Sequence, residues 1–333
     1  MKQGKVAIFM AGRLLVVCLL AIGLCGCSAP QPPQSPAAVP AATTEVRVVV
    51  TRNFGQELVF DEVVELRGKM CAMDALKQVA EIETAYGGGF VNAINGVRSQ
   101  YTGSGAAKKD WFIYANGILT NVGALDYTLH PGDIERWDLH DWSFHHLIPA
   151  ITGHFPEPFV HGYEGTVRPT IVIYQDNFKK EAEDVAAKLS QLGVASISIK
   201  SISELSEEEK EFCNLLLLGD MDCKLISELN QVWKRLGFFA HFEEDKLVVL
   251  NSRGEIAAEH GDGTGLIQAT QSLWNPKGIG ICQNVVWMVS GTDEAGVKSA
   301  IATLVNRYSD FQYAFAVVIT DGEILSRVPE LIP

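Results

Sequence analysis

The chain has 333 residues, of which 47% are hydrophobic, and its formal net charge is −13. This length suggests two domains, and the hydrophobic content is sufficient for buried cores. The negative charge argues against nucleic acid, and against an anionic lipid surface, as the main partner.

The first 27 residues have the pattern of a bacterial secretory signal. They open with three basic residues, Lys2, Lys5 and Arg13. The apolar run Leu14–Leu24 is too short to span a bilayer comfortably and has the length of a signal-peptide core. The final Leu-Cys-Gly-Cys resembles the lipobox of bacterial lipoproteins. This resemblance implies that Cys27 is lipidated and anchors the mature protein on the extracytoplasmic face of the cell membrane. An ordinary signal peptide and an uncleaved anchor are the alternatives.

Residues 28–44 contain five prolines and no charged residue. Such a composition favours an extended tether of up to about 50 Å rather than a domain. Beyond this segment the chain has four cysteines, at positions 71, 213, 223 and 282. No CxxC pair exists, which leaves a zinc knuckle or a thioredoxin-like motif without support. Cys213 and Cys223 could form a disulfide, or both could be buried thiols.

Residues 45–143 have the pattern of a small α+β domain. Two strand-like runs separated by the turn at Asn53–Gln56 predict a hairpin, and a segment with one apolar face predicts a helix. The expected elements are strands at 46–51 and 57–66, a helix at 72–82, a strand at 90–97 and a loop at 98–109. Together with the strands that follow, this order favours a β-grasp-like fold.

The stretch from Trp111 to Trp142 is the most informative part of the chain. Its first residues, WFIYANG, predict a strand that ends in an Asn-Gly turn at 116–117. The Pro-Gly-Asp at 131–133 predicts a second turn, before a strand at 134–140. Alternation places Trp111 and Tyr114 on opposite faces of the first strand, and the sequence leaves open which face is exposed.

A family resemblance rests on this stretch. The pattern W-x₄-NG, followed by Gly-Ala-x-x-Tyr and then Pro-Gly-Asp-Ile, resembles the C-terminal domain of transcobalamin and intrinsic factor and the related bacterial surface modules. The matching residues are Trp111, Asn116, Gly117, Val122, Gly123, Ala124, Asp126, Tyr127, Gly132, Asp133 and Ile134. In the vitamin carriers this domain closes over one face of cobalamin, opposite a helical barrel. The resemblance covers residues 45–143, under a third of the chain, and the sequence shows no helical repeat array that would form the barrel.

The resemblance implies a ligand site at the loop Leu119–Ala124. Its mixture of small, apolar and polar residues would allow the backbone to approach a flat ring. The candidate ligand-binding residues are Trp111, Tyr114, Asn116, Thr120, Asn121, Val122, Gly123, Ala124 and Tyr127. These residues also have a structural interpretation. Trp111 and Tyr114 could be core aromatics, and the role of Asn116 could be limited to shaping a turn.

Residues 144–165 form a Pro- and aromatic-rich connector. Five histidines lie in or next to it, at positions 140, 145, 146, 154 and 161. Their irregular spacing favours a packed linker with ordinary solvated histidines. A transition-metal site, or an axial ligand to a bound cobalt, is the alternative.

Residues 166–333 alternate strand-like and helix-like segments. This pattern predicts an α/β domain with a parallel or mixed sheet and helices on both faces. The expected strands are at 168–174, 195–202, 214–219 and 285–290, with a hairpin within 238–250. The expected helices are at 177–192, 203–212, 223–236, 265–274 and 292–308.

Three features of this second domain could touch a ligand. The Gly-rich stretch His260–Leu266 lacks the spacing of a nucleotide-binding loop, so a plain loop is the better interpretation. Asp220 and Asp293 follow predicted strands, where α/β sheets bind ligands, but both are also good helix N-caps. No G-x-S-x-G, HExxH or kinase signature is present.

The sequence therefore predicts a non-catalytic lipoprotein that binds a small ligand for uptake and has no cofactor. A corrinoid such as cobalamin is the ligand that the resemblance implies, and a membrane permease is the partner that uptake implies. The alternative is an interaction module of the cell envelope that binds protein or polysaccharide.

Overall fold

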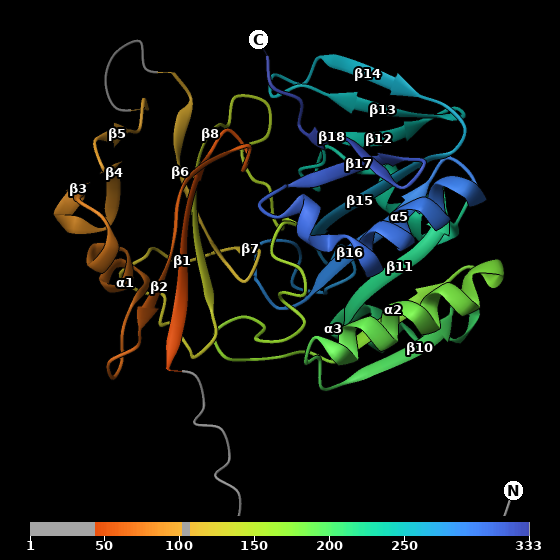
Figure 1. The fold of residues 1–333 in the computed structure, drawn as a ribbon, viewed down its shortest axis with the longest axis horizontal. Helices are drawn as coiled ribbons and strands as arrows, with labels where there is room; N and C mark the ends of the chain where they lie inside the picture. Colours follow the sequence, from red (N-terminus) through yellow and green to blue (C-terminus); the bar gives the residue numbers. More distant parts are fainter. Residues whose placement is uncertain (1–43, 102–106, 333) are drawn as a thin grey trace, which may run out of the picture. The chain divides into compact units, whose positions relative to one another are not determined.

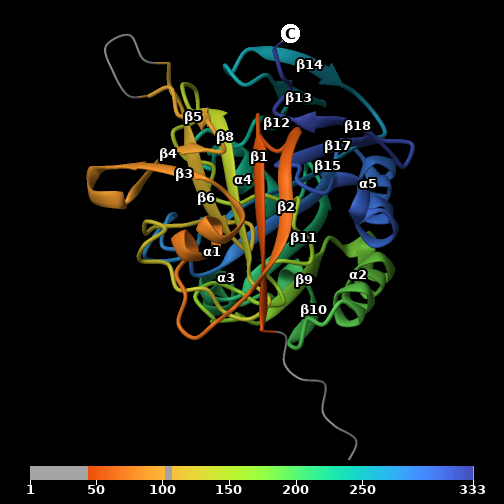
Figure 2. The same ribbon diagram turned by 60° about the vertical axis from the view of Figure 1, so that its left-hand side comes forward.

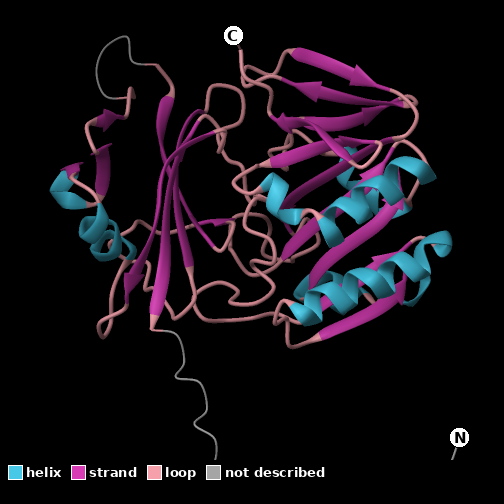
Figure 3. Cartoon of the chain, in the orientation of Figure 1, coloured by secondary structure: helices cyan, strands magenta, loops and turns pink. Residues whose placement is uncertain are grey.

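The computed structural model describes residues 44–101 and 107–332, which belong to one compact unit. The predicted signal segment, Cys27 and nearly all of the predicted tether lie outside the described residues. Strands dominate the structure (Figures 1 and 3). In the described part of the chain, no helix is long and apolar enough to cross a membrane.

The first sheet has five strands in the order β2-β1-β8-β6-β7. They are β1 (Glu45–Arg52), β2 (Glu57–Glu65), β6 (Lys109–Ala115), β7 (Ile118–Leu119) and β8 (Ile134–Asp141). The central strands β1 and β8 are parallel, whereas β2 and β6 run antiparallel to them. The predicted turn at 116–117 is confirmed, since Asn116 and Gly117 both have positive φ, as a tight hairpin turn requires.

Helix α1 (Ala72–Val79) packs on one face of the first sheet (Figure 2). It ends three residues earlier than predicted, because the backbone of Ala80 is extended and leads into β3 (Ile82–Ala85). The predicted strand at 90–97 is divided into β4 (Phe90–Ile94) and β5 (Val97–Arg98). Asn95 and Gly96 between them have positive φ, so this Asn-Gly pair forms a second hairpin turn.

The second sheet is mixed and has seven strands in the order β10-β9-β11-β16-β15-β17-β18. They are β9 (Thr170–Tyr174), β10 (Ile197–Ser201), β11 (Asn214–Asp220), β15 (Thr264–Gln271), β16 (Val285–Gly291), β17 (Ala316–Thr320) and β18 (Glu323–Val328). The strands β10, β9, β11 and β16 are parallel, and the other three add antiparallel neighbours.

Both faces of the second sheet are covered. Helices α2 (Lys179–Gln191) and α5 (Glu294–Asn306) pack on one face (Figure 1). Helix α4 (Lys224–Gln231) and a small antiparallel sheet pack on the other face. The strands of this small sheet are β12 (Ala240–Glu243), β13 (Lys246–Leu250) and β14 (Ile256–His260), and the short α3 (Glu207–Phe212) precedes β11.

The helix predicted at 265–274 is wrong, because residues 264–271 form strand β15. Every residue of β15 is buried, between β16 and β17. Its polar members Gln268, Thr270 and Gln271 interrupt the apolar run that marks a buried strand in a sequence. The strands β14, β17 and β18 were not predicted. The four cysteines of the described part, Cys71, Cys213, Cys223 and Cys282, are free thiols.

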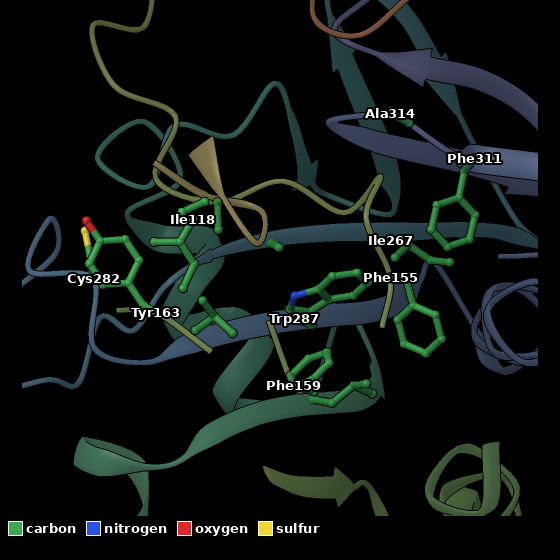
Figure 4. Packing of buried hydrophobic residues seen from close by; sticks show 14 of the residues in the cluster. Ile118, Phe155, Phe159, Tyr163, Ile267, Cys282, Trp287, Phe311 and Ala314 are labelled. Carbon is green, nitrogen blue, oxygen red and sulfur yellow. The ribbon is translucent and has the colours of Figure 1, made fainter. Parts of the chain in front are cut away.

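The connector, residues 144–165, packs against both sheets. Ile151 donates a backbone hydrogen bond to Gly117 in the turn between β6 and β7, and Thr152 donates one to Phe315 just before β17. Phe155 and Phe159 lie next to Trp287 of β16, with ring centroids 5.6 and 5.5 Å away (Figure 4). The connector is therefore part of the core, as the packed-linker interpretation predicted, but its histidines are not all solvated, since His145 and His154 are buried.

Candidate ligand-binding surface

The loop Leu119–Ala124 is fixed at both of its ends. The Leu119 amide donates to the Pro149 oxygen, and the Thr120 amide donates to the Ile113 oxygen. At the other end, the amides of Asp126 and Tyr127 both donate to the oxygen of Gly123. These bonds give the loop a defined shape without help from a ligand.

The nine predicted ligand-binding residues divide into two groups. Trp111, Tyr114, Asn116, Ala124 and Tyr127 are buried, with at most 7% of each exposed. The other four, which lie at or near the surface, are Thr120, Asn121, Val122 and Gly123. Only the tip of the loop is therefore positioned to meet a ligand.

The buried members have structural partners. The side-chain amide of Asn116 donates to Asp133 Oδ1 at 2.7 Å and to the Gly162 oxygen at 2.9 Å, while its own oxygen accepts from the Ile134 amide at 2.7 Å. Every polar group of this side chain is thus occupied, and Asn116 joins the two predicted turns. Its turn-forming interpretation is the one that the contacts favour.

The two faces of β6 are both covered. Trp111 packs in the core beneath α1, and its Nε1 donates to the Val97 oxygen at 3.3 Å. Tyr114 points to the opposite side and meets Phe315, which lies just before β17, with ring centroids 5.6 Å apart. Burial raises the pKa of Tyr114. Neither face of β6 is therefore exposed at these positions, because Trp111 and Tyr114 are both core residues.

Tyr163 of the connector supports the loop from beneath. Its hydroxyl donates to Asn121 Oδ1 at 3.0 Å and lies 3.3 Å from the Asn121 amide. Its ring packs edge-on against Tyr127, at 5.3 Å between centroids. Burial raises the pKa of Tyr127 and of Tyr163, so both hydroxyls stay protonated.

The glycine-rich turn Tyr86–Gly89 adjoins the loop. A Cβ on Gly123 would lie 3.9 Å from the Gly89 oxygen, and a Cβ on Gly89 would lie 3.9 Å from the Leu125 side chain. Tyr86 is 83% exposed and Leu125 is 44% exposed. We call Tyr86–Gly89 together with Leu119–Leu125 the loop surface. Sequence reasoning missed Tyr86, although an aromatic residue before three glycines was a visible signal.

The connector histidines do not converge. His140 lies 2.8 Å from Asp138, His145 meets the Phe238 oxygen, and His161 meets Glu157. Among the described residues, no group of three or more His, Cys, Asp or Glu side chains is arranged to hold a metal ion. His140 instead belongs to a buried polar cluster with Arg136 and Asp138.

The two aspartates of the second domain make local contacts. Asp293 caps α5 by accepting from the Gly296 amide at 2.8 Å, and it also accepts from the Gly263 amide at 2.9 Å. The loop predicted at 260–266 is only partly correct, because residues 261–263 form a turn between β14 and β15, and Asp293 ties this turn to the helix. Asp220 accepts from the side-chain amide of Gln175 at 3.3 Å.

An open groove of about 550 Å³ lies between α2 and α5, but charged side chains line much of it.

A family model described as a domain of unknown function (DUF4430) matches residues 70–141. The match contains the loop Leu119–Leu125 and ends with β8, but it omits β1 from the middle of the first sheet. Among solved structures, a candidate metal-binding protein from Ruminococcus gnavus ATCC 29149 is similar, with 16% identity and a TM-score of 0.23. That similarity covers 29% of this chain and 97% of the other. No curated protein gives a match.

Proposed function

We propose that this chain is a non-catalytic binding protein, anchored on the extracytoplasmic face of a membrane through lipidated Cys27, and that it captures a corrinoid such as cobalamin. The observation that carries the proposal is the loop surface, where exposed Leu125 and the backbone of Gly123 lie near Gly89, and exposed Tyr86 belongs to the same glycine-rich turn as Gly89. An uptake role would pair the protein with a membrane permease that receives the ligand.

The loop surface has the chemistry that a corrin needs. A corrin is a large flat macrocycle with amide side arms, so it requires apolar contacts against the ring and polar groups at the rim. Tyr86 and Leu125 supply apolar area, and Thr120 and Asn121 supply polar groups. The glycines let the ligand approach the backbone closely because they carry no Cβ.

The strand order supports a β-grasp-like assignment for residues 45–143. The first and last long strands, β1 and β8, are parallel neighbours at the centre, and each has an antiparallel partner on its outer side. Helix α1 covers one face of this arrangement. The resemblance of the loop residues to transcobalamin then implies that the loop Leu119–Ala124 of this domain contacts the vitamin.

Titration of the chain from residue 29 onward with cobalamin and cobinamide, followed by absorbance or calorimetry, tests the proposal. A single loop surface is a small interface, so we expect modest affinity unless a second wall is supplied. The titration should therefore extend to about 100 μM, which corresponds to roughly −5.5 kcal/mol. If neither corrinoid binds by that concentration, the corrinoid assignment fails and the envelope-interaction role takes its place.

A further inference from the structure

The side chain of Gln271 joins three segments that are remote from one another in the sequence. Gln271 is the last residue of β15 and is 2% exposed. Its Nε2 donates to the Pro149 oxygen of the connector at 3.1 Å and, over a longer 3.5 Å, to the Leu119 oxygen. Its Oε1 accepts from the amides of Gly280 and Cys282, at 2.9 and 2.8 Å. One buried side chain therefore contacts the start of the loop surface, the connector and the loop that follows β15.

The loop that follows β15 lies against the loop surface. We call residues 272–284, which connect β15 to β16, the β15–β16 loop. The thiol of Cys282 donates to the Leu119 oxygen at 3.1 Å. It also lies next to the hydroxyl of Tyr163 (Figure 4), and that hydroxyl donates to Asn121. The loop surface therefore has a neighbour in the second half of the chain, beyond residues 70–141 that the family model matches.

These contacts hold the first residue of the loop from two sides. The Leu119 amide donates to the Pro149 oxygen, and the Leu119 oxygen accepts from Gln271 and Cys282. A loop that is ordered before its ligand arrives loses less conformational entropy on binding, and its affinity is correspondingly higher. The second half of the chain thus contributes to the order of a surface that belongs to the first half.

We propose that Gln271 is a positioning residue for the ligand site at the loop surface, and that it couples this site to the β15–β16 loop. The proposal rests on the proposed function, because it assigns a residue of the second half to the same ligand. Gln271 is buried and acts through the backbone of Leu119 rather than by touching the ligand. Because coupling between two sites is reciprocal, a ligand at the loop surface must also stabilise the contacts that Gln271 makes to Gly280 and Cys282.

Cobinamide titrations of Gln271→Met test the positioning role. Methionine fills a similar volume but has no amide, so the variant removes the hydrogen bonds and keeps the packing. Gln268→Met is the matched control, since Gln268 lies on the same strand, is also 2% exposed and contacts Met288 Sδ at 3.6 Å. We expect binding to be at least about tenfold weaker in Gln271→Met and unchanged in Gln268→Met. Equal affinities of the two variants would overturn the proposal.

Hydrogen exchange measured by NMR separates this proposal from the corrinoid assignment, because it needs no ligand. In the free protein, Gln271→Met should speed the exchange of the Leu119 and Cys282 amides by at least about tenfold relative to Gln268→Met, since these loops open more often. Unchanged exchange would refute the positioning role whether or not cobinamide binds. If exchange responds as expected but the wild type does not bind cobinamide, the corrinoid assignment fails and the positioning role stands.

A milder variant guards against a folding defect in Gln271→Met. Cys282→Ala removes only the thiol that donates to the Leu119 oxygen, and it should speed exchange of the Leu119 amide by about threefold. No change in that variant would count against the coupling. In the wild type, saturating cobinamide should slow the exchange of the Gly280 and Cys282 amides. Binding of cobinamide without this slowing would show that the β15–β16 loop is not coupled to the site.

Discussion

The guanidinium of Arg136 donates a 2.8 Å hydrogen bond to the backbone oxygen of Tyr313, which lies 177 residues further along the chain. Arg136 is fully buried and lies 3.6 Å from the carboxylate of Asp138. Asp138 also accepts from the amides of Phe54 and Gly55, at 3.0 and 2.8 Å. A buried ionic network therefore connects the first sheet to the chain just before β17.

This network should be sensitive to the loss of its cation. Burial raises the pKa of Asp138, but the hydrogen bond and charge of His140, the charge of Arg136 and a hydrogen bond from Thr51 lower it to about 2. Arg136→Met should lower the free energy of unfolding by about 3–5 kcal/mol, because a buried charge loses a partner. Urea denaturation measures this loss.

The control is Arg98→Met, which removes an exposed ion pair with Glu83 and should lower the free energy of unfolding by less than about 1 kcal/mol. Equal effects of the two variants would contradict the role of the network.

The two sheets should unfold together. Phe315 of the second half packs against Phe54, Tyr114 and His140 of the first half, at 5.5, 5.6 and 5.5 Å between ring centroids. We expect a single transition in differential scanning calorimetry of the folded chain, and a loss of about 3–5 kcal/mol in Phe315→Ala. Two well-separated transitions would instead show that residues 45–143 and 166–333 unfold independently.

Glu135 should make stability depend on pH. It is 1% exposed, its Oε1 accepts from Trp137 Nε1 at 2.6 Å, and burial raises its pKa to about 8. The folded state thus prefers the protonated acid. Its contribution is complete below the usual pKa near 4.5 and is lost as pH rises from there through about 8, by at most about 5 kcal/mol.

Glu135→Gln tests this dependence by removing the titration while keeping the shape and the acceptor for Trp137. Denaturation midpoints between pH 5 and pH 9 should fall less steeply in this variant than in the wild type. Glu62→Gln, at an exposed position of β2, is the control and should follow the wild type. Parallel curves for wild type and Glu135→Gln would contradict the shifted pKa.

Local signals were sufficient to predict most elements of the first sheet. The Asn-Gly pair at 116–117 and the alternation in β6 are short-range features, and their structures depend mainly on neighbouring residues. The sequence predicts a helix where strand β15 lies, because the burial of this strand is imposed by β16 and β17, whose pairing is not visible in the local sequence.

The candidate site was only partly predictable for the same reason. The loop tip, Thr120–Gly123, follows from the family pattern. The burial of Tyr114 depends on Phe315, which is remote in the sequence, and the contact between Gly123 and Gly89 depends on how two turns meet.

The anchor leads to a chemical prediction. If Cys27 is lipidated, residues 1–26 are absent from the mature protein and its first residue carries acyl chains. Two or more chains give stable membrane attachment, since each buried methylene contributes about 0.8 kcal/mol. Mass spectrometry of the N-terminal peptide should find an acylated Cys27. An unmodified Cys27, or a mature chain that begins elsewhere, would remove the anchor from the account.

Blocking the loop surface tests the proposed function most directly. A Cβ at Gly123 would meet its nearest neighbours only at 3.9 and 4.0 Å, so Gly123→Trp should fold normally while its indole covers the surface. Gly261→Trp, where a Cβ would have no neighbour within 4 Å, is the matched control in the second half of the chain. In absorbance titrations with cobinamide, we predict saturable binding by the wild type and the control and a loss of binding in Gly123→Trp. Equal binding by all three proteins, or by none, would contradict a corrinoid site at this loop.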